Sequence, residues 1–336
     1  MDKRDLRIVF MGTPDFAVES LRALVENGYH VAGVVTAPDK SVGRHGSILR
    51  YSTVKEYALS KDLPVLQPDK LKDEAFLSAL QALQADLQIV VAFRMLPEVV
   101  WDMPQYGTFN LHGSLLPQYR GAAPINWAII HGEKETGVTT FFLTHEIDTG
   151  RIIRQRRSPI AKTDNAGIVH DKLMVLGAAL VLETVDLLIA HKGRIETIPQ
   201  EKLYRDLSEL RPAPKLYLDT CRINWYQPAK TIYDFIRGLS PYPAAWTDLE
   251  MPDGTYQVLK IYESKIVTHT HTLPAGSILS DAKTFLDIIT EDECIRLLSV
   301  QLAGKKRLNI KEFLNGFKAL PERVGEIIVN PPILNP

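Results

Sequence analysis

Apolar runs of strand length alternate with helical patterns along the first half of the chain. Three runs rich in Val, Ile and Leu have the length of a strand: residues 6–12, 30–36 and 87–93. A helical pattern covers residues 15–27, and residues 165–190 predict a long scaffold helix with a leucine face. Residues 151–160 predict a polar strand pair. Uninterrupted apolar strands between helices indicate an α/β domain with a Rossmann-like, mostly parallel sheet.

The pattern changes near residue 197. Residues 197–214 are polar and punctuated by proline, which predicts a linker. Beyond a short helix at residues 228–239, strand patterns follow at nearly regular spacing: residues 244–250, 255–267, 276–280, 284–290 and 293–303. Short strands separated by Gly and Asp turns favour a small, OB-like antiparallel β-barrel. We therefore expect a first domain over residues 1–196 and a second over 215–330.

Composition narrows the class of protein. The 336 residues include 45% hydrophobic residues, and 39 Lys and Arg against 40 Asp and Glu give a net charge of -1. Such a chain buries a sizeable core and has no general basic field for a nucleic acid. Cys221 and Cys294 lack metal-ligand spacing, which argues against a disulfide framework or a metal site and suits a reducing cytoplasm. We recognise no leader and no stretch of membrane-spanning length, and expect a protein that is not bound to a membrane.

The candidate chemistry begins on the strand TFNLH at residues 108–112. Asn110 and His112 are two residues apart, so their side chains share one face of the strand. An amide donor beside an imidazole can hold a developing oxyanion and move a proton in acyl transfer. Asp148 is a carboxylate that could orient the imidazole. Ordinary loop chemistry also explains such a pair, but the run of Gly, Pro and small residues at 114–124 favours a site.

A ligand of this domain is expected beyond the carboxyl ends of the strands. Residues 93–96 and the end of the strand at His112 both lie there. The turn at residues 12–16 lacks the second and third glycines of a dinucleotide fingerprint, so a tightly bound pyrophosphate is not expected. The sequence thus predicts a site assembled from two neighbouring strand ends.

The chain resembles the methionyl-tRNA formyltransferase family over nearly its whole length. The matching segments are IVFMGTPDFAV (8–18), PDKSVGR (38–44), NLHGSLLPQYRGAAPI (110–125), IDTG (147–150), PYPAAWT (241–247) and QLAGKKR (301–307). The first half alone specifies only the wider folate-dependent formyltransferase superfamily, and the later segments narrow the resemblance.

The resemblance implies formyl transfer from 10-formyltetrahydrofolate to the α-amino group of methionyl initiator tRNA, without a covalent enzyme intermediate. Asn110 and His112 would stabilise the oxyanion, and Asp148 would orient the imidazole and help to relay a proton. The residues implied for the folate are Phe93, Arg94, Met95, Leu96, Ser114, Leu115, Leu116, Pro117, Thr144 and Ile147. Relatives carry Tyr-Gly where this chain has Phe93-Arg94, so Arg94 is equally compatible with a solvated charge at a strand end.

Two basic segments are candidates for the tRNA. The loop after the second strand carries Lys40, Arg44 and Arg50, and the resemblance implies that it enters the acceptor stem. The second segment contains Lys305, Lys306 and Arg307. An ordinary flexible loop and a solvated surface run are the alternatives for the two segments.

Two other functions share much of this pattern. The hydrolase portion of 10-formyltetrahydrofolate dehydrogenase has both domains and uses water as acceptor, and a non-catalytic RNA-binding module on a Rossmann-like scaffold is an alternative of another class. Glycinamide ribonucleotide formyltransferase would leave the last third of the chain without a role. We expect a cytoplasmic monomer that uses 10-formyltetrahydrofolate as co-substrate and no metal.

Overall fold

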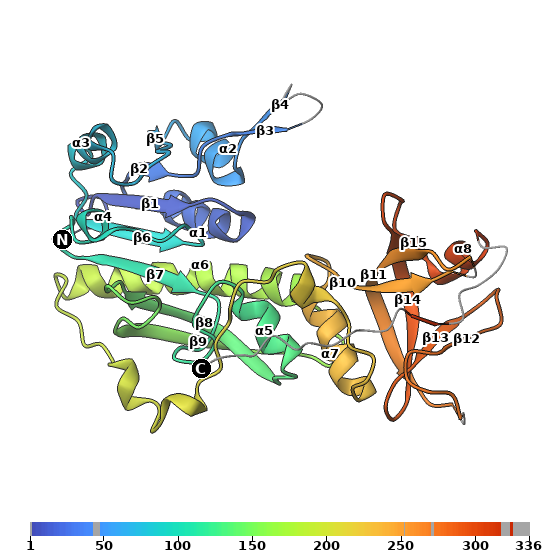
Figure 1. Cartoon of the computed structure of the whole chain (residues 1–336). Helices are drawn as coiled ribbons and strands as arrows, with labels where there is room; N and C mark the ends of the chain where they lie inside the picture. Colours follow the sequence, from blue (N-terminus) through green and yellow to red (C-terminus); the bar gives the residue numbers. More distant parts are fainter. Residues whose placement is uncertain (1, 43–47, 252, 270–271, 317–322, 325–336) are drawn as a thin grey trace. The chain divides into compact units, whose positions relative to one another are not determined.

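The computed structural model describes residues 2–42, 48–251, 253–269, 272–316 and 323–324. The chain forms two compact units (Figure 1). The first unit comprises Met1–Pro124, Glu135–Pro159 and Val169–Pro214, and the second comprises Ile125–Lys134, Ile160–Ile168 and the chain from Lys215. Two short segments of the first half therefore belong to the second unit.

The first unit is built on a seven-stranded sheet of order β5-β2-β1-β6-β7-β8-β9. Its strands are β1 (Ile8–Gly12), β2 (Val31–Val35), β5 (Val65–Leu66), β6 (Leu87–Val91), β7 (Thr108–His112), β8 (Glu135–Phe142) and β9 (Ile152–Pro159). Neighbouring strands from β5 to β7 are parallel, whereas β8 is antiparallel to both β7 and β9. The expected mostly parallel, Rossmann-like sheet is confirmed.

The expected polar strand pair at residues 151–160 is wrong. This segment is one strand, β9, and its partner is β8. Six consecutive residues of β8 are buried, including Thr136, Thr139 and Thr140, so the strand shows no alternation of polar and apolar positions. A strand covered on both faces lacks the period of two by which half-buried strands are recognised.

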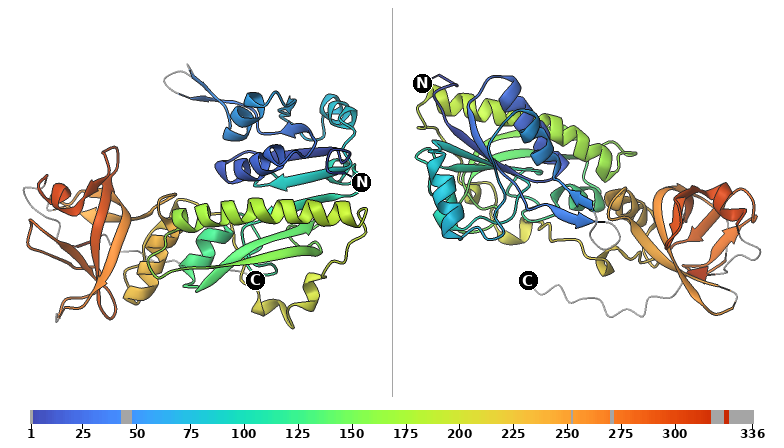
Figure 2. Two further views of the ribbon diagram at one scale, coloured as in Figure 1. Left: turned by 180° about the vertical axis from the view of Figure 1, so that it is seen from behind. Right: turned by 90° about the horizontal axis from the view of Figure 1, so that it is seen from above.

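Helices cover both faces of this sheet (Figure 2). They are α1 (Asp15–Glu26), α2 (Thr53–Ser60), α3 (Glu74–Ala82), α4 (Glu98–Trp101) and α6 (Ala166–Ala190). Val9 and Met11 of β1 share an apolar cluster with side chains of α3 and α4. α6 approaches β7 so closely that a Cβ on Gly177 would lie 2.7 Å from the Leu111 side chain. Because side chains alternate along β7, Asn110 and His112 face away from α6.

One prediction about membranes is corrected by α6. Within the described residues, this helix is long and apolar enough to span a bilayer, with a hydropathy of 2.2 over its most apolar window. The expectation that no stretch reaches such a length was therefore wrong. In the structure α6 lies along the sheet, where its Thr184 hydroxyl bonds the Thr140 hydroxyl of β8 at 2.8 Å. A helix that packs along a sheet meets the same criteria of length and composition, so its apolar character alone identifies no membrane segment.

The second unit contains the expected antiparallel, barrel-like sheet. Its strands are β10 (Ala245–Glu250), β11 (Tyr256–Val267), β12 (Ile278–Ser280), β13 (Leu286–Ile289), β14 (Cys294–Leu302), β15 (Leu308–Asn309) and β16 (Arg323–Val324). The order is β12-β13-β14-β11-β10-β16, with β15 paired to β14. A bridge between Ser277 and Arg323 joins the two ends of this order, so the sheet nearly closes on itself.

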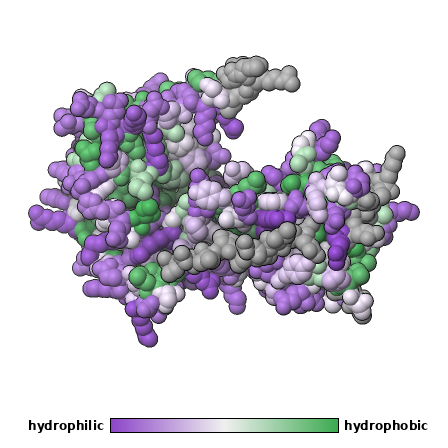
Figure 3. All heavy atoms as spheres, viewed as in Figure 1, coloured by the Kyte–Doolittle hydropathy of each residue, from purple (hydrophilic) through white to green (hydrophobic). Residues whose placement is uncertain are grey.

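Three helices accompany the barrel: α5 (Pro124–Ile130), α7 (Ala229–Leu239) and α8 (Ile310–Leu314). α7 presents Ile232 and Ile236 to an apolar core that also contains Trp225 and residues of β10, β11, β13 and β14. On the face shown in Figure 3, most residues are hydrophilic and the apolar residues form scattered patches.

Residues 197–214, which the sequence predicts to be a linker, lie against the sheet of the first unit. They contain the short 3-10 helices η2 (Gln200–Lys202) and η3 (Leu207–Glu209), and a further one, η4 (Asp219–Cys221), follows. Ile198 forms a bridge with Ile152, and Ala213 forms one with Gly121. We call residues 197–214 the strap, because both of its ends hydrogen-bond to other segments of the first unit.

Candidate active site

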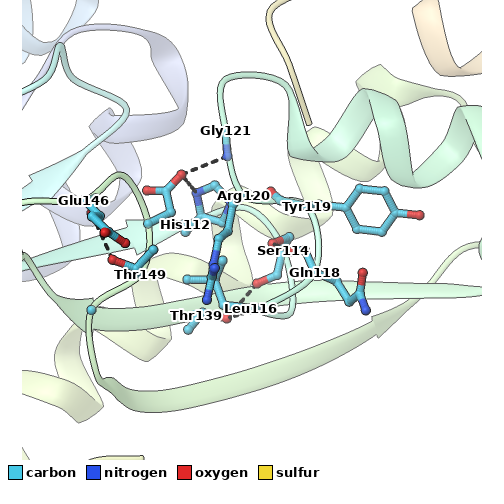
Figure 4. A network of polar contacts seen from close by, with 12 residues as sticks. His112, Ser114, Leu116, Gln118, Tyr119, Arg120, Gly121, Thr139, Glu146 and Thr149 are labelled. Atoms are coloured by element: carbon cyan, nitrogen blue, oxygen red, sulfur yellow. Dashed lines mark hydrogen bonds and ion pairs between the residues drawn. The ribbon is translucent and has the colours of Figure 1, made fainter. Parts of the chain in front are cut away.

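His112 occupies the last position of β7 and is 6% exposed. Its Nε2 lies 2.8 Å from the carbonyl oxygen of Tyr119, and its Nδ1 lies 3.7 Å from Oδ2 of Asp148 (Figure 4). A carbonyl oxygen only accepts hydrogen bonds, so Nε2 carries a proton and donates it. The other ring nitrogen therefore faces the carboxylate. The predicted convergence of the imidazole and the carboxylate of the IDTG loop is present.

The distance between Nδ1 of His112 and Asp148 is longer than a hydrogen bond. Catalytic contacts are often long in unliganded enzymes and shorten when substrates bind, so this gap is compatible with a working pair. The side chains of His112 and Asp148 are only 7% and 13% exposed. Both side chains are thus shielded from water.

The backbone around Asp148 is unusual. Asp148 has φ +56°, a left-handed conformation that costs a non-glycine residue free energy. Gly150 follows, and a Cβ there would lie 1.6 Å from the carbonyl oxygen of Phe142, so only glycine fits. The Asp148 carboxylate accepts the backbone N–H of Gly121 at 2.9 Å. The carboxylate is thus held by main-chain geometry rather than by a flexible tether.

Asn110 lies two residues before His112 on the same face of β7. It is partly exposed, and across the described parts of the chain its side-chain amide has no hydrogen-bond partner. A free N–H donor beside an imidazole is the equipment expected of an oxyanion-binding site. Asn110 and His112 therefore share one face at the carboxyl end of β7, where the Asp148 carboxylate approaches the imidazole.

The loop after β7 is held by residues that sequence patterns did not single out. Thr139 of β8 donates to the carbonyl of Ser114 at 2.7 Å and accepts the N–H of Leu116 at 3.1 Å. Gln155 of β9 donates to the carbonyl of Leu116 at 2.8 Å. Both anchors lie on the antiparallel end of the sheet, so their positions follow from strand pairing and not from any local motif.

The strand-end residues predicted for the folate separate into different environments. Arg94 donates to the main-chain carbonyls of Pro68 and Asp69, so it joins two loops and is not a free solvated charge. Met95 is 70% exposed, whereas Leu96 is buried in the apolar cluster with α3 and α4. The side chain of Leu96 therefore packs in the core and anchors the end of the strand.

The loop that follows β8 is partly open to solvent. Thr144 bonds the hydroxyl of Thr149 at 3.2 Å, which ties the two ends of the loop together. Ile147, between them, is 57% exposed. This apolar side chain is free to contact a ligand above the strand ends.

The first predicted tRNA segment forms a hairpin of β3 (Lys40–Val42) and β4 (Ile48–Arg50). Lys40 pairs with Arg50 across it, and both side chains are exposed, whereas Arg44 lies outside the described residues. Asp39 at the base bonds Lys55 at 2.5 Å, and hydrogen bonds from Lys55 and Gln67 lower the pKa of its carboxyl. The base of the hairpin is thus fixed by an ionised aspartate.

The second predicted tRNA segment lies between β14 and β15. Arg307 is engaged with Glu263 at 2.5 Å and with the Ser299 hydroxyl at 2.7 Å. Lys305 and Lys306 are exposed and, within the described residues, form no salt bridge. These two lysines, rather than Arg307, are the cations of this segment that are available to a phosphate.

Comparisons with known proteins agree with this geometry. The family model described as formyl transferase matches residues 6–185, and the model of the formyl transferase C-terminal domain matches residues 215–318. The methionyl-tRNA formyltransferase of Parabacteroides distasonis is 67% identical over 96% of this chain and 99% of its own length. That of Bacteroides fragilis is 62% identical over 94% of this chain and 97% of its own.

Among solved structures, HypX from Aquifex aeolicus in complex with tetrahydrofolic acid has a TM-score of 0.62 at 19% identity. The match covers 94% of this chain and 48% of HypX, and it shows a common fold. Both domains, their order and the sequence identity over nearly full length lead to one assignment. The chain belongs to the formyl transferase family and, within it, to the methionyl-tRNA formyltransferases.

Proposed function

We propose that this enzyme transfers the formyl group of 10-formyltetrahydrofolate to the α-amino group of methionine carried by initiator tRNA. One observation carries the proposal: His112 faces Asp148 at 3.7 Å beside the free amide of Asn110, in a chain 67% identical to a methionyl-tRNA formyltransferase. The arrangement provides donors for an oxyanion and a carboxylate that can accompany a proton.

In the proposed mechanism the amine attacks the formyl carbon directly. The carbonyl oxygen becomes an oxyanion, which Asn110 and His112 stabilise. Asp148 orients the imidazole and helps to relay the proton lost by the attacking amine to N10 of the leaving folate. The tetrahedral intermediate then releases tetrahydrofolate and the formylated methionyl-tRNA, and no covalent enzyme intermediate forms.

We assign the folate to the strand end and the two loops beside it. Main-chain groups of residues 93–96 suit the flat, amide-like edge of a pterin, because amides offer donors and acceptors in one plane. Residues 114–117 are held by Thr139 and Gln155, and the loop with Thr144 and Ile147 covers the ligand. Arg94 acts by joining the neighbouring loop rather than by contacting the folate.

We assign the tRNA to two surfaces. The hairpin that carries Lys40 and Arg50 is proposed for the acceptor stem, and Arg44 belongs to the same segment. The barrel, residues 215–330, is proposed to add phosphate contacts through Lys305 and Lys306. We further propose that the enzyme acts as a monomer in the cytoplasm, with residues 1–196 as its catalytic domain.

The test follows 10-formyltetrahydrofolate consumption with and without methionyl initiator tRNA. We expect consumption only with the tRNA, together with formylmethionyl product. Consumption without tRNA would instead identify a hydrolase, and no turnover with tRNA binding alone would identify an RNA-binding module. Either result contradicts the proposal.

A further inference from the structure

The strap contributes a buried side chain to the candidate active site. Gln200, in η2, is 1% exposed and lies in a segment whose composition predicts only a linker. Its Nε2 donates to the carbonyl oxygens of Asp148 at 2.8 Å and Gly150 at 2.7 Å. Its Oε1 accepts from Nε of Arg120 at 3.0 Å and from Nη2 at 2.7 Å. Both donors and both acceptor positions of the buried amide are therefore occupied.

These bonds link the two segments that orient the Asp148 carboxylate, the first through its backbone carbonyls and the second through the Arg120 side chain. One segment is Asp148 itself, held at its carbonyl in a left-handed conformation. The other is the turn at Arg120 and Gly121, whose Gly121 N–H binds Oδ2 of Asp148. A single amide thus fixes the loop that carries the carboxylate and the turn that donates to it.

The main chain of the strap supports the same turn. Arg211 accepts the N–H of Tyr119 at 2.7 Å, and Ala213 donates to the carbonyl of Arg120 at 2.8 Å. Gly121 has φ +124°, and a Cβ there would lie 2.5 Å from the carbonyl oxygen of Ala213. Since the Tyr119 carbonyl accepts from Nε2 of His112, the strap supports both partners of the pair.

We propose that Gln200 is a positioning residue of the formyl transfer reaction, which sets the Asp148 carboxylate against His112 through its two bonds to the IDTG loop. This inference rests on the proposed function. The alternative is that Gln200 only docks the strap, in which case its loss would lower stability without a specific effect on turnover. The two roles predict different kinetics because an error in placing a catalytic group acts on the chemical step.

Gln118 provides a matched control. Its amide also joins the strap to the first unit, because it donates to the Glu209 carbonyl at 2.8 Å and accepts the N–H of Arg211 at 2.8 Å. Within the part of the chain that the structure describes, the Gln118 side chain forms no hydrogen bond with Asp148. Gln118→Ala therefore removes a comparable strap contact and leaves the carboxylate alone.

The experiment measures kcat, KM for both substrates and Tm for Gln200→Ala, Gln200→Glu and Gln118→Ala. For Gln200→Ala we expect kcat to fall by about 10- to 100-fold with KM values little changed. Gln200→Glu keeps the acceptor for Arg120 but lacks the N–H donors, so it should stay low in kcat. Gln118→Ala should lose similar thermal stability and keep kcat within about twofold of wild type. Equal kcat losses in Gln200→Ala and Gln118→Ala, or rescue by Gln200→Glu, would overturn the proposal.

A double-mutant cycle with Asp148→Ala completes the test. If Gln200 acts through Asp148, Gln200→Ala should cause little further loss of kcat in the Asp148→Ala background. Multiplying losses would contradict the inference. Hydrogen exchange of the peptide at residues 144–151 gives a readout without turnover, and it should rise in Gln200→Ala but not in Gln118→Ala. Wild-type formylation tests the proposed function by itself, so the two failures are distinguishable.

Discussion

The active-site edge of the first unit and the helix α7 of the second unit both hold buried polar groups, but they use different means. At the active-site edge, amides and hydroxyls such as Gln200 and Thr139 bond the carbonyls of irregular loops. At α7, charged residues bond one another or a helix end, as Asp234 does with Arg237 at 2.7 Å. The first arrangement sets loop geometry, and the second stabilises a regular element.

The difference predicts whether a substitution in each region will change turnover or stability. Strained loops pinned by neutral hydrogen bonds place catalytic groups, so their loss should act mainly on turnover. Buried ion pairs on a regular helix lie far from any reacting group in their own unit. Breaking such a pair should therefore lower the free energy of unfolding. Variants of matched chemistry in the two regions test this distinction.

The largest expected effect is at α7. Asp234 and Arg237 have side chains that are 5% and 8% exposed, so Asp234→Ala would leave a buried guanidinium without its carboxylate partner, with only the Asp164 carbonyl at 2.8 Å still accepting from it. We expect the free energy of unfolding to fall by about 3–5 kcal/mol, with kcat of the folded enzyme unchanged. Chemical denaturation measures the loss. The double variant Asp234→Ala/Arg237→Met should recover part of it, and an unchanged deficit would show that charge burial is not the cause.

Asn110→Ala should have the largest effect on turnover. Removal of one oxyanion donor typically lowers kcat by about 10²–10³, which is about 2.7–4 kcal/mol in the barrier. Because the Asn110 amide bonds no described residue, the Tm should stay at the wild-type value. Asn126→Ala is the matched control, since Asn126 donates to the Gly238 carbonyl at 2.8 Å in the second unit. It should lower Tm and keep kcat; the reverse pattern in the two variants would contradict the comparison.

Asp292 gives a smaller effect that depends on pH. It accepts the N–H of Ala229 at the start of α7 at 2.7 Å, and this bond lowers the pKa of its carboxyl. A helix cap of this kind is worth about 1 kcal/mol, so Asp292→Ala should lower stability by that amount at neutral pH.

A lowered pKa in the folded state has a defined consequence for stability. The contribution of Asp292 is complete above the pKa of the unfolded chain and is lost as pH falls through the pKa of the folded chain. Thermal melts of wild type and Asp292→Ala should therefore converge at acid pH, while Glu291→Ala serves as the control. A difference that grows on acidification would contradict the assignment.

The smallest expected effect is on the barrel surface. Lys305→Glu/Lys306→Glu should raise KM for the tRNA by a few fold and reduce the slope of log KM against log salt by about one per lost phosphate contact. The KM for the folate and Tm should not change, because both lysines are exposed. Lys283→Glu, at another exposed site of the same unit, is the control. Identical tRNA kinetics in all these proteins would remove the two lysines from the interface.

The outline of both units followed from the sequence where patterns were local. Apolar runs located β1, β2 and β6, and regular spacing located β10 to β14, because the residues of each strand form a recognisable pattern on their own. β8 was missed since it is buried on both faces, and the strap was predicted as a linker because prolines and charges dominate it. Neither error is visible without knowing what packs against the segment.

The residues of the candidate site also divide into those that local patterns predicted and those that they did not. Asn110 and His112 could be predicted from a spacing of two on one strand, and Asp148 from the IDTG motif. Gln200, Thr139 and Gln155 could not, because each acts on a loop distant in sequence. No local pattern records a hydrogen bond between residues separated by 25 to 52 positions.

Residue type and short-range spacing were enough to predict the alternation of elements, the candidate reactive groups and the family to which the chain belongs. How those groups are held emerged with the fold: the left-handed Asp148, the 3.7 Å approach to His112 and the buried amide of Gln200. The physical reason is that side-chain chemistry is a property of single residues. The position of a carboxylate, by contrast, depends on hydrogen bonds that exist only after distant segments have packed together.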